Sequence, residues 1–363
     1  MKTISQGIDI MIPPNPGSEE VYRHIERIGR VCYKSEDKIT ADSYKGFIER
    51  LRTNEHWAML EHYIFIIELS EKLYNDLMNE MILFTQQDPW FSNYIGFIKF
   101  SKLDELDTAN ECKKYIMSFN ITAINNLWKS ESISKNSKSA FAYVLDWIND
   151  QYECLVNIPA DAKKYDGSGY VRYTTVELPF GIAWISMPEL AAILKSPRSY
   201  DVYALHASMT VKFHTTRAIC MEVLRHRPAS YAMESTRYAN YSKGKFGSEI
   251  TVVKPEFTYT NAEMENKWNL ACQETEIAYM DMMRDGAKAQ DAREVLPNAL
   301  KAELVMTARI MEFQHFFKFR AHSAAHPMMQ ELAYALMGGL IKVESALLGE
   351  EEAKKMITKE VRK

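Results

Sequence analysis

The sequence predicts a mixed α/β (α+β) fold, because helical and strand periodicities both occur in it. Within residues 19–52, apolar side chains recur at spacings of three and four, which is typical of amphipathic helices. The β-branched and aromatic run at residues 63–69 predicts a strand. A second strand is expected at residues 209–215, where apolar and polar side chains alternate before a helical pattern begins.

Three helices are expected in the second half of the chain. The first covers residues 215–227 and ends at Pro228, because proline cannot continue a helix. Its inward-facing stripe is expected to consist of Ala218, Met221 and Leu224. The other two helices are expected near residues 261–285 and from about 298 to 319. The charged stretch 349–363 is expected to be a solvated helix end.

Composition places the chain among ordinary globular proteins. It has 363 residues, of which 47% are hydrophobic and 25% are charged, with a net charge of −4. This charge argues against a general nucleic-acid binder. Five scattered cysteines without paired spacing indicate a reducing compartment. With neither a membrane span nor a signal sequence evident, we expect a cytoplasmic protein that does not bind membranes.

Composition and hydrophobic periodicity change along the chain and suggest four segments. Residues 72–205 are rich in Asn, Lys, Tyr and Ser and uneven in period, so they are interpreted as a large insertion. The segments are an N-terminal part of the main domain at 1–71, the insertion at 72–205, a C-terminal part of the main domain at 206–350 and a charged tail at 351–363.

The most informative motif is Arg225-His226-Arg227, followed by Ser235 and Arg237. Two guanidinium groups about 6 Å apart repel by roughly 3 kcal/mol at an effective dielectric near 20. A partly buried cluster of this kind favours an anion, and the planar fork of arginine suits phosphate or carboxylate. The alternative is a solvated basic face at a helix end, which the helix dipole favours.

A second group of charged residues follows Pro297. On the helix expected at 298–319, Arg309 and Arg320 stand eleven residues apart, about three turns, and would share a face. His315 lies between them among phenylalanines, and such a stripe is more often core than cofactor site. A guanidinium buried among aromatic rings needs an acidic partner or a bound anion.

Other candidate residues are assigned structural roles. His322 and His326 are four residues apart but lack a third ligand, so no metal site is predicted. Cys220 is expected to be a small core residue. Glu222 lies three residues before Arg225, and an ion pair between the two is the simplest interpretation of that spacing.

The segment around the Arg225-His226-Arg227 motif resembles the signature of the flavin-dependent thymidylate synthases, Arg-His-Arg followed after seven residues by Ser. Three further stretches resemble that family in the same order. They are the turn with His56, Glu61 and His62, the Arg-x-x-Leu-Pro stretch at Arg293, and the closing stretch with His315 and Arg320. The resemblance covers roughly residues 19–66 and 208–339.

The resemblance implies a central antiparallel or mixed sheet with long helices, and a homotetramer whose active sites form between subunits. It implies a methyltransferase, a flavoprotein of dTMP biosynthesis that methylates dUMP to dTMP. FAD would be the cofactor, NADPH the reductant and methylenetetrahydrofolate the one-carbon donor. Because the hydride comes from reduced flavin in this family, no cysteine nucleophile is required.

The resemblance also implies a role for each matching residue. Arg320 would be the catalytic residue, contacting the uracil and favouring loss of its N3 proton. The residues expected to bind dUMP are Glu222, Arg225, Ser235, Arg237, Arg293 and Arg320. The residues expected to bind FAD are Arg225, His226, Arg227, His315 and Arg309.

Several positions depart from the family pattern. Ala232-Met233 stand where Asn-Glu is usual, with Glu234 shifted one place on, and Met311 replaces an Arg. A Ser or Thr is common where this chain has Ala58. These departures leave two alternatives open beside the thymidylate synthase. One is a related dCMP-methylating or hydroxymethylating enzyme, and the other is a non-catalytic nucleotide-binding paralogue.

Overall fold

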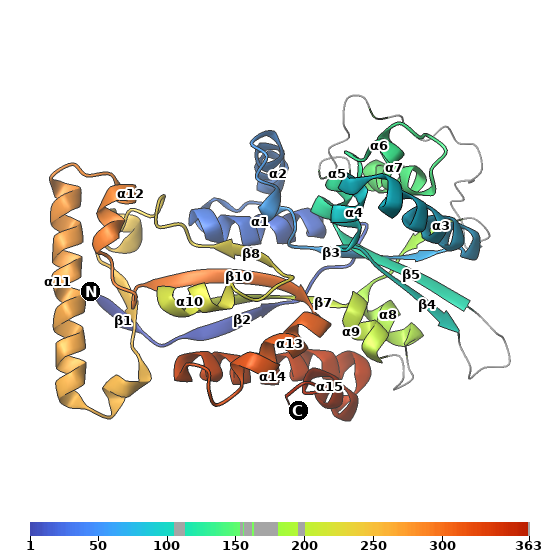
Figure 1. The fold of residues 1–363 in the computed structure, drawn as a ribbon. Helices are drawn as coiled ribbons and strands as arrows, with labels where there is room; N and C mark the ends of the chain where they lie inside the picture. Colours follow the sequence, from blue (N-terminus) through green and yellow to red (C-terminus); the bar gives the residue numbers. More distant parts are fainter. Residues whose placement is uncertain (105–112, 153–154, 156–161, 163–180, 195–199, 362–363) are drawn as a thin grey trace. The chain divides into compact units, whose positions relative to one another are not determined.

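The computed structural model describes residues 1–104, 113–152, 155, 162, 181–194 and 200–361 (Figure 1). They form two compact units. Unit 1 comprises Met1–Ile12, Arg27–Ile39 and Met209–Lys363, and unit 2 comprises Pro13–Glu26 and Thr40–Ser208. Helices and antiparallel sheets occur in both units, which confirms the predicted α+β class. Residues 72–205 fall within unit 2, and their assignment as an insertion stays a prediction.

The core of unit 1 is a four-stranded sheet with the order β2-β7-β10-β8. Its strands are β2 (Gly7–Met11), β7 (Ser208–Thr216), β10 (Lys301–Arg309) and β8 (Ser230–Met233). β2 is antiparallel to β7, with Gly7 opposite His214, and β8 is antiparallel to β10. The expected strand at 209–215 is thereby confirmed. β1 (Lys2–Ile4) pairs in parallel with β9 (Thr251–Val253).

The prediction of one helix over 298–319 is wrong. Lys301–Arg309 is strand β10, and α13 covers only Ile310–Arg320. Along the start of β10 the side chains alternate, with Ala302 and Leu304 buried while Lys301 and Glu303 are partly exposed. The sheet takes this segment because β10 pairs with β8 and completes the centre of the sheet. Arg309 and Arg320 therefore do not share a helix face.

Helix α10 (Arg217–Val223) ends before Pro228, but its predicted inward stripe is wrong. The buried residues are Ile219, Cys220 and Val223, whereas Met221 is 51% exposed and Ala218 is also exposed. The side-chain oxygen of Thr216 accepts a hydrogen bond from the backbone N–H of Ile219 and so fixes where the helix begins. Because the helix begins at this point, its buried face is offset by about one residue from the predicted face.

Helix α14 (Pro327–Leu348) packs on β2, and α15 (Glu350–Ile357) packs on α14 (Figure 1). Close approach of α14 to the strand depends on Gly339, where an added Cβ would lie 2.5 Å from the Ile10 side chain. The predicted solvated tail is helical, but one side of α15 is buried. Its buried residues are Ala353, Met356 and Ile357.

The remaining helices of unit 1 border the two-stranded sheet. They are the long helix α11 (Ala262–Arg284), which confirms the prediction at 261–285, with α12 (Ala289–Ala292) and the short turn η6 (Arg293–Val295). Tyr279 of α11 packs in a buried cluster with Tyr241 and Val252. Helix α1 (Glu20–Tyr33) begins in unit 2 and continues into unit 1.

Unit 2 is built on an antiparallel sheet with the order β4-β5-β3-β6. Its strands are β3 (Ile64–Leu69), β4 (Lys99–Asp104), β5 (Lys113–Asn120) and β6 (Ile182–Trp184). The predicted strand at 63–69 is confirmed as β3. Aromatic side chains dominate the core, where Phe65 lies between Phe119 and Tyr152 at ring-centroid distances of 5.6 and 5.0 Å.

The helices of unit 2 surround this sheet. They are α2 (Ser43–Thr53), α3 (Glu71–Gln87), α4 (Pro89–Ile95), α5 (Ile121–Leu127), α6 (Glu131–Ser134), α7 (Ala140–Gln151), α8 (Met187–Ile193) and α9 (Tyr200–His206). Helices α1 and α2 confirm the prediction for residues 19–52. Across the described parts of both units, no helix combines the length and apolar character needed to cross a membrane.

Candidate active site

The turn that carries Arg225-His226-Arg227 joins the end of α10 to strand β8 in unit 1. Tyr231 of β8 stabilises it, because its hydroxyl lies 3.0 Å from the Val223 carbonyl oxygen and 2.7 Å from that of His226. The hydroxyl has a single proton, which these two carbonyl oxygens share, and only the Val223 carbonyl belongs to the end of α10, where such groups lack partners within the helix. The three consecutive side chains are thereby presented from a fixed backbone.

Arg320, at the end of α13, binds this turn through three hydrogen bonds. Its Nε donates to Nε2 of His226 at 2.6 Å. One terminal nitrogen donates to the Glu222 carboxylate at 3.1 Å, and the other donates to the Glu222 backbone carbonyl at 3.0 Å. A guanidinium has five N–H donors, so two remain for another acceptor. Glu222 therefore pairs with Arg320, and the expected i,i+3 pair with Arg225 is wrong.

His226 is neutral in this arrangement. Arginine only donates, so Nε2 of His226 must accept the hydrogen bond and the ring proton sits on Nδ1. The ring is 8% exposed, and burial lowers its pKa to about 4, with the charge of Arg320 and the nearby His315 acting in the same direction. The imidazole therefore remains uncharged throughout the physiological pH range.

Arg225 and Arg227 point their charges to solvent, and both are exposed. The guanidinium of Arg227 lies 5.6 Å from the ring centre of Tyr231. Neither arginine forms an ion pair within the described part of the chain. Two adjacent guanidinium groups without carboxylate partners are suited to bind a polyanion.

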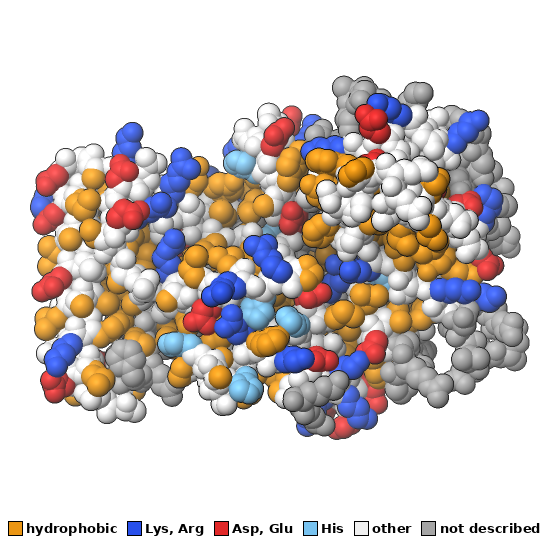
Figure 2. Space-filling view, viewed as in Figure 1, with side chains coloured by type: hydrophobic (Ala, Val, Ile, Leu, Met, Phe, Trp, Pro, Cys, Tyr) orange, Lys and Arg blue, Asp and Glu red, His pale blue; other side chains and the backbone are white. Residues whose placement is uncertain are grey.

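Aromatic rings adjoin the charged groups. The His226 ring lies 4.8 Å from Phe316 and 6.2 Å from His315, and His315 lies 4.9 Å from Phe319. His315 and Phe319 are exposed while Phe316 is buried. Figure 2 shows histidine and basic side chains gathered over α10, α13 and α14 on this face of unit 1. A flat, negatively charged ligand would find stacking surfaces and cations together here.

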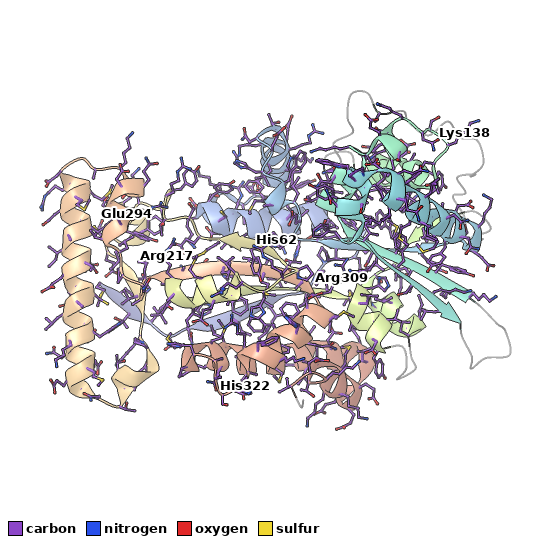
Figure 3. All side chains as sticks on the ribbon, in the orientation of Figure 1. His62, Lys138, Arg217, Glu294, Arg309 and His322 are labelled. Atoms are coloured by element: carbon purple, nitrogen blue, oxygen red, sulfur yellow. The ribbon has the colours of Figure 1, made fainter. Side chains whose placement is uncertain are left out.

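Arg309 occupies the junction of β10 and α13. It is 8% exposed, and burial lowers its pKa to about 10, although Glu312 in the first turn of α13 acts in the opposite direction. Figure 3 labels Arg309 at one end of β10 and Glu294 beside α12, near the other end of the same sheet.

The other predicted site residues do not join the cluster around Arg320. Arg293 lies next to Glu294 and forms an ion pair with it, with Nε 3.4 Å from its carboxylate. Ser235 follows β8, where its backbone N–H donates to the Cys32 carbonyl oxygen at 3.1 Å. Arg237 is exposed and lies 5.8 Å from the ring centre of Tyr238. The structure thus brings together Glu222, His226, His315 and Arg320, with Arg225 and Arg227 adjacent in the chain.

Glu234 stands one position after the place where the resembled family usually has an acid, and this shift changes the face of β8 on which the carboxylate lies. Tyr231 and Met233 point to one side of β8, toward α10, while Glu234 points to the other. On that opposite side Glu234 pairs with Lys301 at 3.2 Å. Glu234 therefore does not replace the acid that is usual at position 233, and Met233 supplies no hydrogen-bonding group there.

Sequence reasoning missed Tyr231 and Phe316 as supports of the site. Tyr231 acts across the turn that precedes it, and Phe316 contacts His226 from a distant segment, and residue spacing along one helix reveals neither contact. A period-2 interpretation of residues 301–309 would have separated Arg309 from α13 and placed Lys301 with Glu303 on one strand face. The alternation was obscured by the strongly apolar run that follows.

The sequence predicted structural roles for three residues, which are Cys220, His322 and His326. Cys220 is buried, as predicted, and burial raises the pKa of its thiol to about 12. His322 and His326 do not share a helix face, because α14 begins only at Pro327. Nδ1 of His326 accepts the backbone N–H of Met328 at 3.2 Å, and Nδ1 of His322 accepts that of Ala324 at 3.1 Å.

Residues 201–343, which include the whole cluster around Arg320, match the model of the family described as thymidylate synthase complementing protein. The resemblance predicted from the sequence is confirmed over this stretch.

Curated relatives carry the name flavin-dependent thymidylate synthase. Those of Thermococcus onnurineus and Pyrococcus abyssi are both 31% identical over 140 residues, 38% of this chain and 56% and 57% of theirs. That of Geobacter sulfurreducens is 32% identical over 133 residues, 36% of this chain and 56% of its own. The chain thus matches a little over half the length of these relatives.

Proposed function

We propose that this protein is a flavin-dependent thymidylate synthase that methylates dUMP to dTMP, with methylenetetrahydrofolate as carbon donor and NADPH as reductant. The observation that carries the proposal is Arg320, which is bound to Glu222 and to neutral His226 and retains two free N–H donors. The names of the relatives and the match over residues 201–343 support it. A homotetramer in the cytoplasm belongs to the same proposal.

The residues present fit an FAD cofactor. Its pyrophosphate requires cations, and Arg225 and Arg227 offer two exposed guanidinium groups that no described carboxylate neutralises. Its ring system requires flat neighbours, and His226 and His315 supply them. Arg309, on the adjoining junction, adds a buried cation. When bound, the flavin would supply the hydride that completes the methyl group.

The substrate would be held by residues from three segments. Arg320 and Glu222 would receive the pyrimidine, while Ser235, Arg237 and Arg293 would bind the phosphate. Arg293 pairs with Glu294 and, among the described contacts, with no residue of the cluster around Arg320, so its contribution would come from another subunit of the proposed tetramer.

Arg320 would act on the pyrimidine through charge. The orientation of its guanidinium is fixed before substrate arrives by three hydrogen bonds. Preorganised donors of this kind stabilise negative charge as it develops, without reorganisation during the reaction. Loss of the uracil N3 proton develops such a charge. Because His226 is neutral, it does not place a second positive charge beside Arg320 that would repel the guanidinium.

A second candidate function is methylation of a different pyrimidine nucleotide, such as dCMP. The specific observation is that Met233 presents a thioether toward α10 while the Glu234 carboxylate points to the other side of β8. A site without that acid would make one fewer hydrogen bond to the base, a change of about 1–3 kcal/mol in base preference.

Two measurements on the purified full chain test the proposal. We expect a flavin absorbance spectrum after incubation with FAD, perturbed on addition of dUMP. We also expect release of tritium from C5-labelled dUMP in the presence of methylenetetrahydrofolate and NADPH. Release from labelled dCMP instead would establish the second candidate. A protein that binds no FAD and releases no tritium from either nucleotide would be a non-catalytic paralogue.

A further inference from the structure

A cavity of about 330 Å³ lies in unit 1, away from the cluster around Arg320. It is lined from β1, β9, β10, the residues that directly follow α1 and β8, and the segment 241–249. Its charged lining residues are Lys2, Lys34, Lys301, Glu234 and Glu249. Because Glu234 points to the opposite side of β8 from Tyr231, this cavity and the cluster around Arg320 lie on different faces of the sheet. Its volume is near the lower end of the range of about 300–1,000 Å³ that is typical of ligand pockets.

Two lysines of the cavity, Lys34 and Lys301, are held in place by carboxylates. Glu303 bridges two of them, with one carboxylate oxygen 2.8 Å from the Lys34 ammonium and the other 2.7 Å from that of Lys301. Lys34 also contacts Glu36, and Lys301 contacts Glu234. Each of the two ammonium groups therefore has two carboxylate partners, and that of Lys301 has a third N–H donor to spare.

Lys2 differs from the other two lysines of the cavity. It is exposed, and its side chain forms no hydrogen bond or ion pair with any residue that the structure describes. Glu249, another acid of the lining, is bound by the amino terminus of Met1 at 3.3 Å. All three donors of the Lys2 ammonium group are thus available to a ligand.

Glu234 is the buried acid of the cavity, with a side chain only 2% exposed. Its contacts are all long: 3.3 Å to the Tyr241 hydroxyl, 3.2 Å to Lys301 and 3.3 Å to the backbone N–H of Glu303. A carboxylate offers about four acceptor positions, and a buried one needs strong partners. One position on Glu234 therefore remains for a donor that enters the cavity.

The mixed charge of the lining decides the class of ligand. A simple anion would meet the lysines but would approach the Glu234 carboxylate, and a simple cation would meet the opposite conflict. We propose that this cavity binds a small zwitterion, a metabolite that carries a phosphate or carboxylate together with an ammonium group. The anionic end would lie toward Lys2 and the lysines bridged by Glu303, and the ammonium end toward Glu234.

Calorimetry with matched probes on the purified full chain tests this site. O-phosphoethanolamine and β-alanine carry both charges, ethyl phosphate and propionate carry only the anion, and ethylammonium carries only the cation. We expect saturable binding of at least one zwitterion and no saturable binding of the probes with a single charge. Tighter binding of O-phosphoethanolamine indicates a phosphate ligand, and tighter binding of β-alanine indicates a carboxylate.

Two variants locate the binding. Lys2 is exposed and forms no ion pair with any residue that the structure describes. The Lys2→Ala variant is therefore expected to unfold like the parent protein and to bind the zwitterion about tenfold more weakly. Glu234→Gln is expected to weaken it by a similar factor, and the Lys342→Ala control on the exposed side of α14 is expected to change nothing.

Three outcomes overturn the proposal. They are binding of neither zwitterion, binding of ethyl phosphate or propionate as tight as that of the zwitterions, and unchanged affinity in Lys2→Ala. None of these measurements depends on flavin or turnover, so the outcome is independent of the proposed synthase activity.

Discussion

Burial of His226 makes the stability of unit 1 depend on pH in a defined window. The pKa of its imidazole is about 4 in the folded protein, against an ordinary value of 6.5. In the unfolded chain the ring takes up a proton below pH 6.5, whereas in the folded protein it resists protonation until about pH 4. The contribution of neutral His226 is therefore present above pH 6.5 and is lost as the pH falls toward 4.

The size of the effect follows from the two pKa values. A difference of about 2.5 units, at about 1.4 kcal/mol per unit, gives a full loss of about 3 kcal/mol below pH 4. At pH 5 the expected loss is about 2 kcal/mol, and at pH 7 it is close to zero. Because His226 is only 8% exposed, solvent screening reduces this figure little.

The assay is urea unfolding of the parent protein and of His226→Gln between pH 7.5 and 4.5. A glutamine oxygen accepts the hydrogen bond from Arg320 but does not titrate in this range. The free energy of unfolding of the parent is expected to fall by about 2 kcal/mol more than that of the variant between pH 7 and 5. Equal losses in the two proteins would refute the reasoning, as would an NMR titration of the His226 ring near pH 6.5.

Two further changes test the two sides of the sheet. Arg320→Lys keeps the charge but cannot form the three hydrogen bonds to His226 and Glu222, so we expect kcat of the proposed synthase to fall about 10²–10³-fold. A steady-state assay measures this, and a change in KM alone would contradict the assigned role. On the other face, burial opposes ionisation of Glu303, but Lys301 and Lys34 outweigh it and lower its pKa to about 2. Its stabilisation is present above pH 4.5 and lost toward pH 2, so Glu303→Gln should unfold with a free energy about 1–3 kcal/mol lower at pH 7. The two proteins should converge as acid is added, and a constant difference down to pH 2.5 in urea titrations would contradict this.

Short-range pattern was sufficient for several elements of the fold. The alternation at 209–215, the β-branched run at 63–69 and the long helical period at 261–285 each predicted the observed element. The helix predicted over 298–319 was wrong in its first half, because Lys301–Arg309 pairs with a strand that is distant in the sequence. Pairing partners outside the local window decided its conformation.

The candidate site shows the same division. The charge and spacing of Arg225-His226-Arg227 indicated an anion site, because adjacent guanidinium groups repel each other and favour an anion when they are partly buried. Sequence spacing assigned Glu222 to Arg225, whereas in the folded chain Glu222 pairs with Arg320, 98 residues away. No rule of local spacing contains a contact of that separation.

The sequence by itself determined the class of fold, the cationic motif and the resemblance that the comparisons confirm over residues 201–343. These follow from residue types and short periods, which any conformation of the chain retains. Only the tertiary structure decided that His226 is neutral, that Arg320 is held with two donors free, and that the Glu234 carboxylate lies on the far side of β8. Burial and long-range hydrogen bonds set these properties, and both exist only after distant segments have packed together.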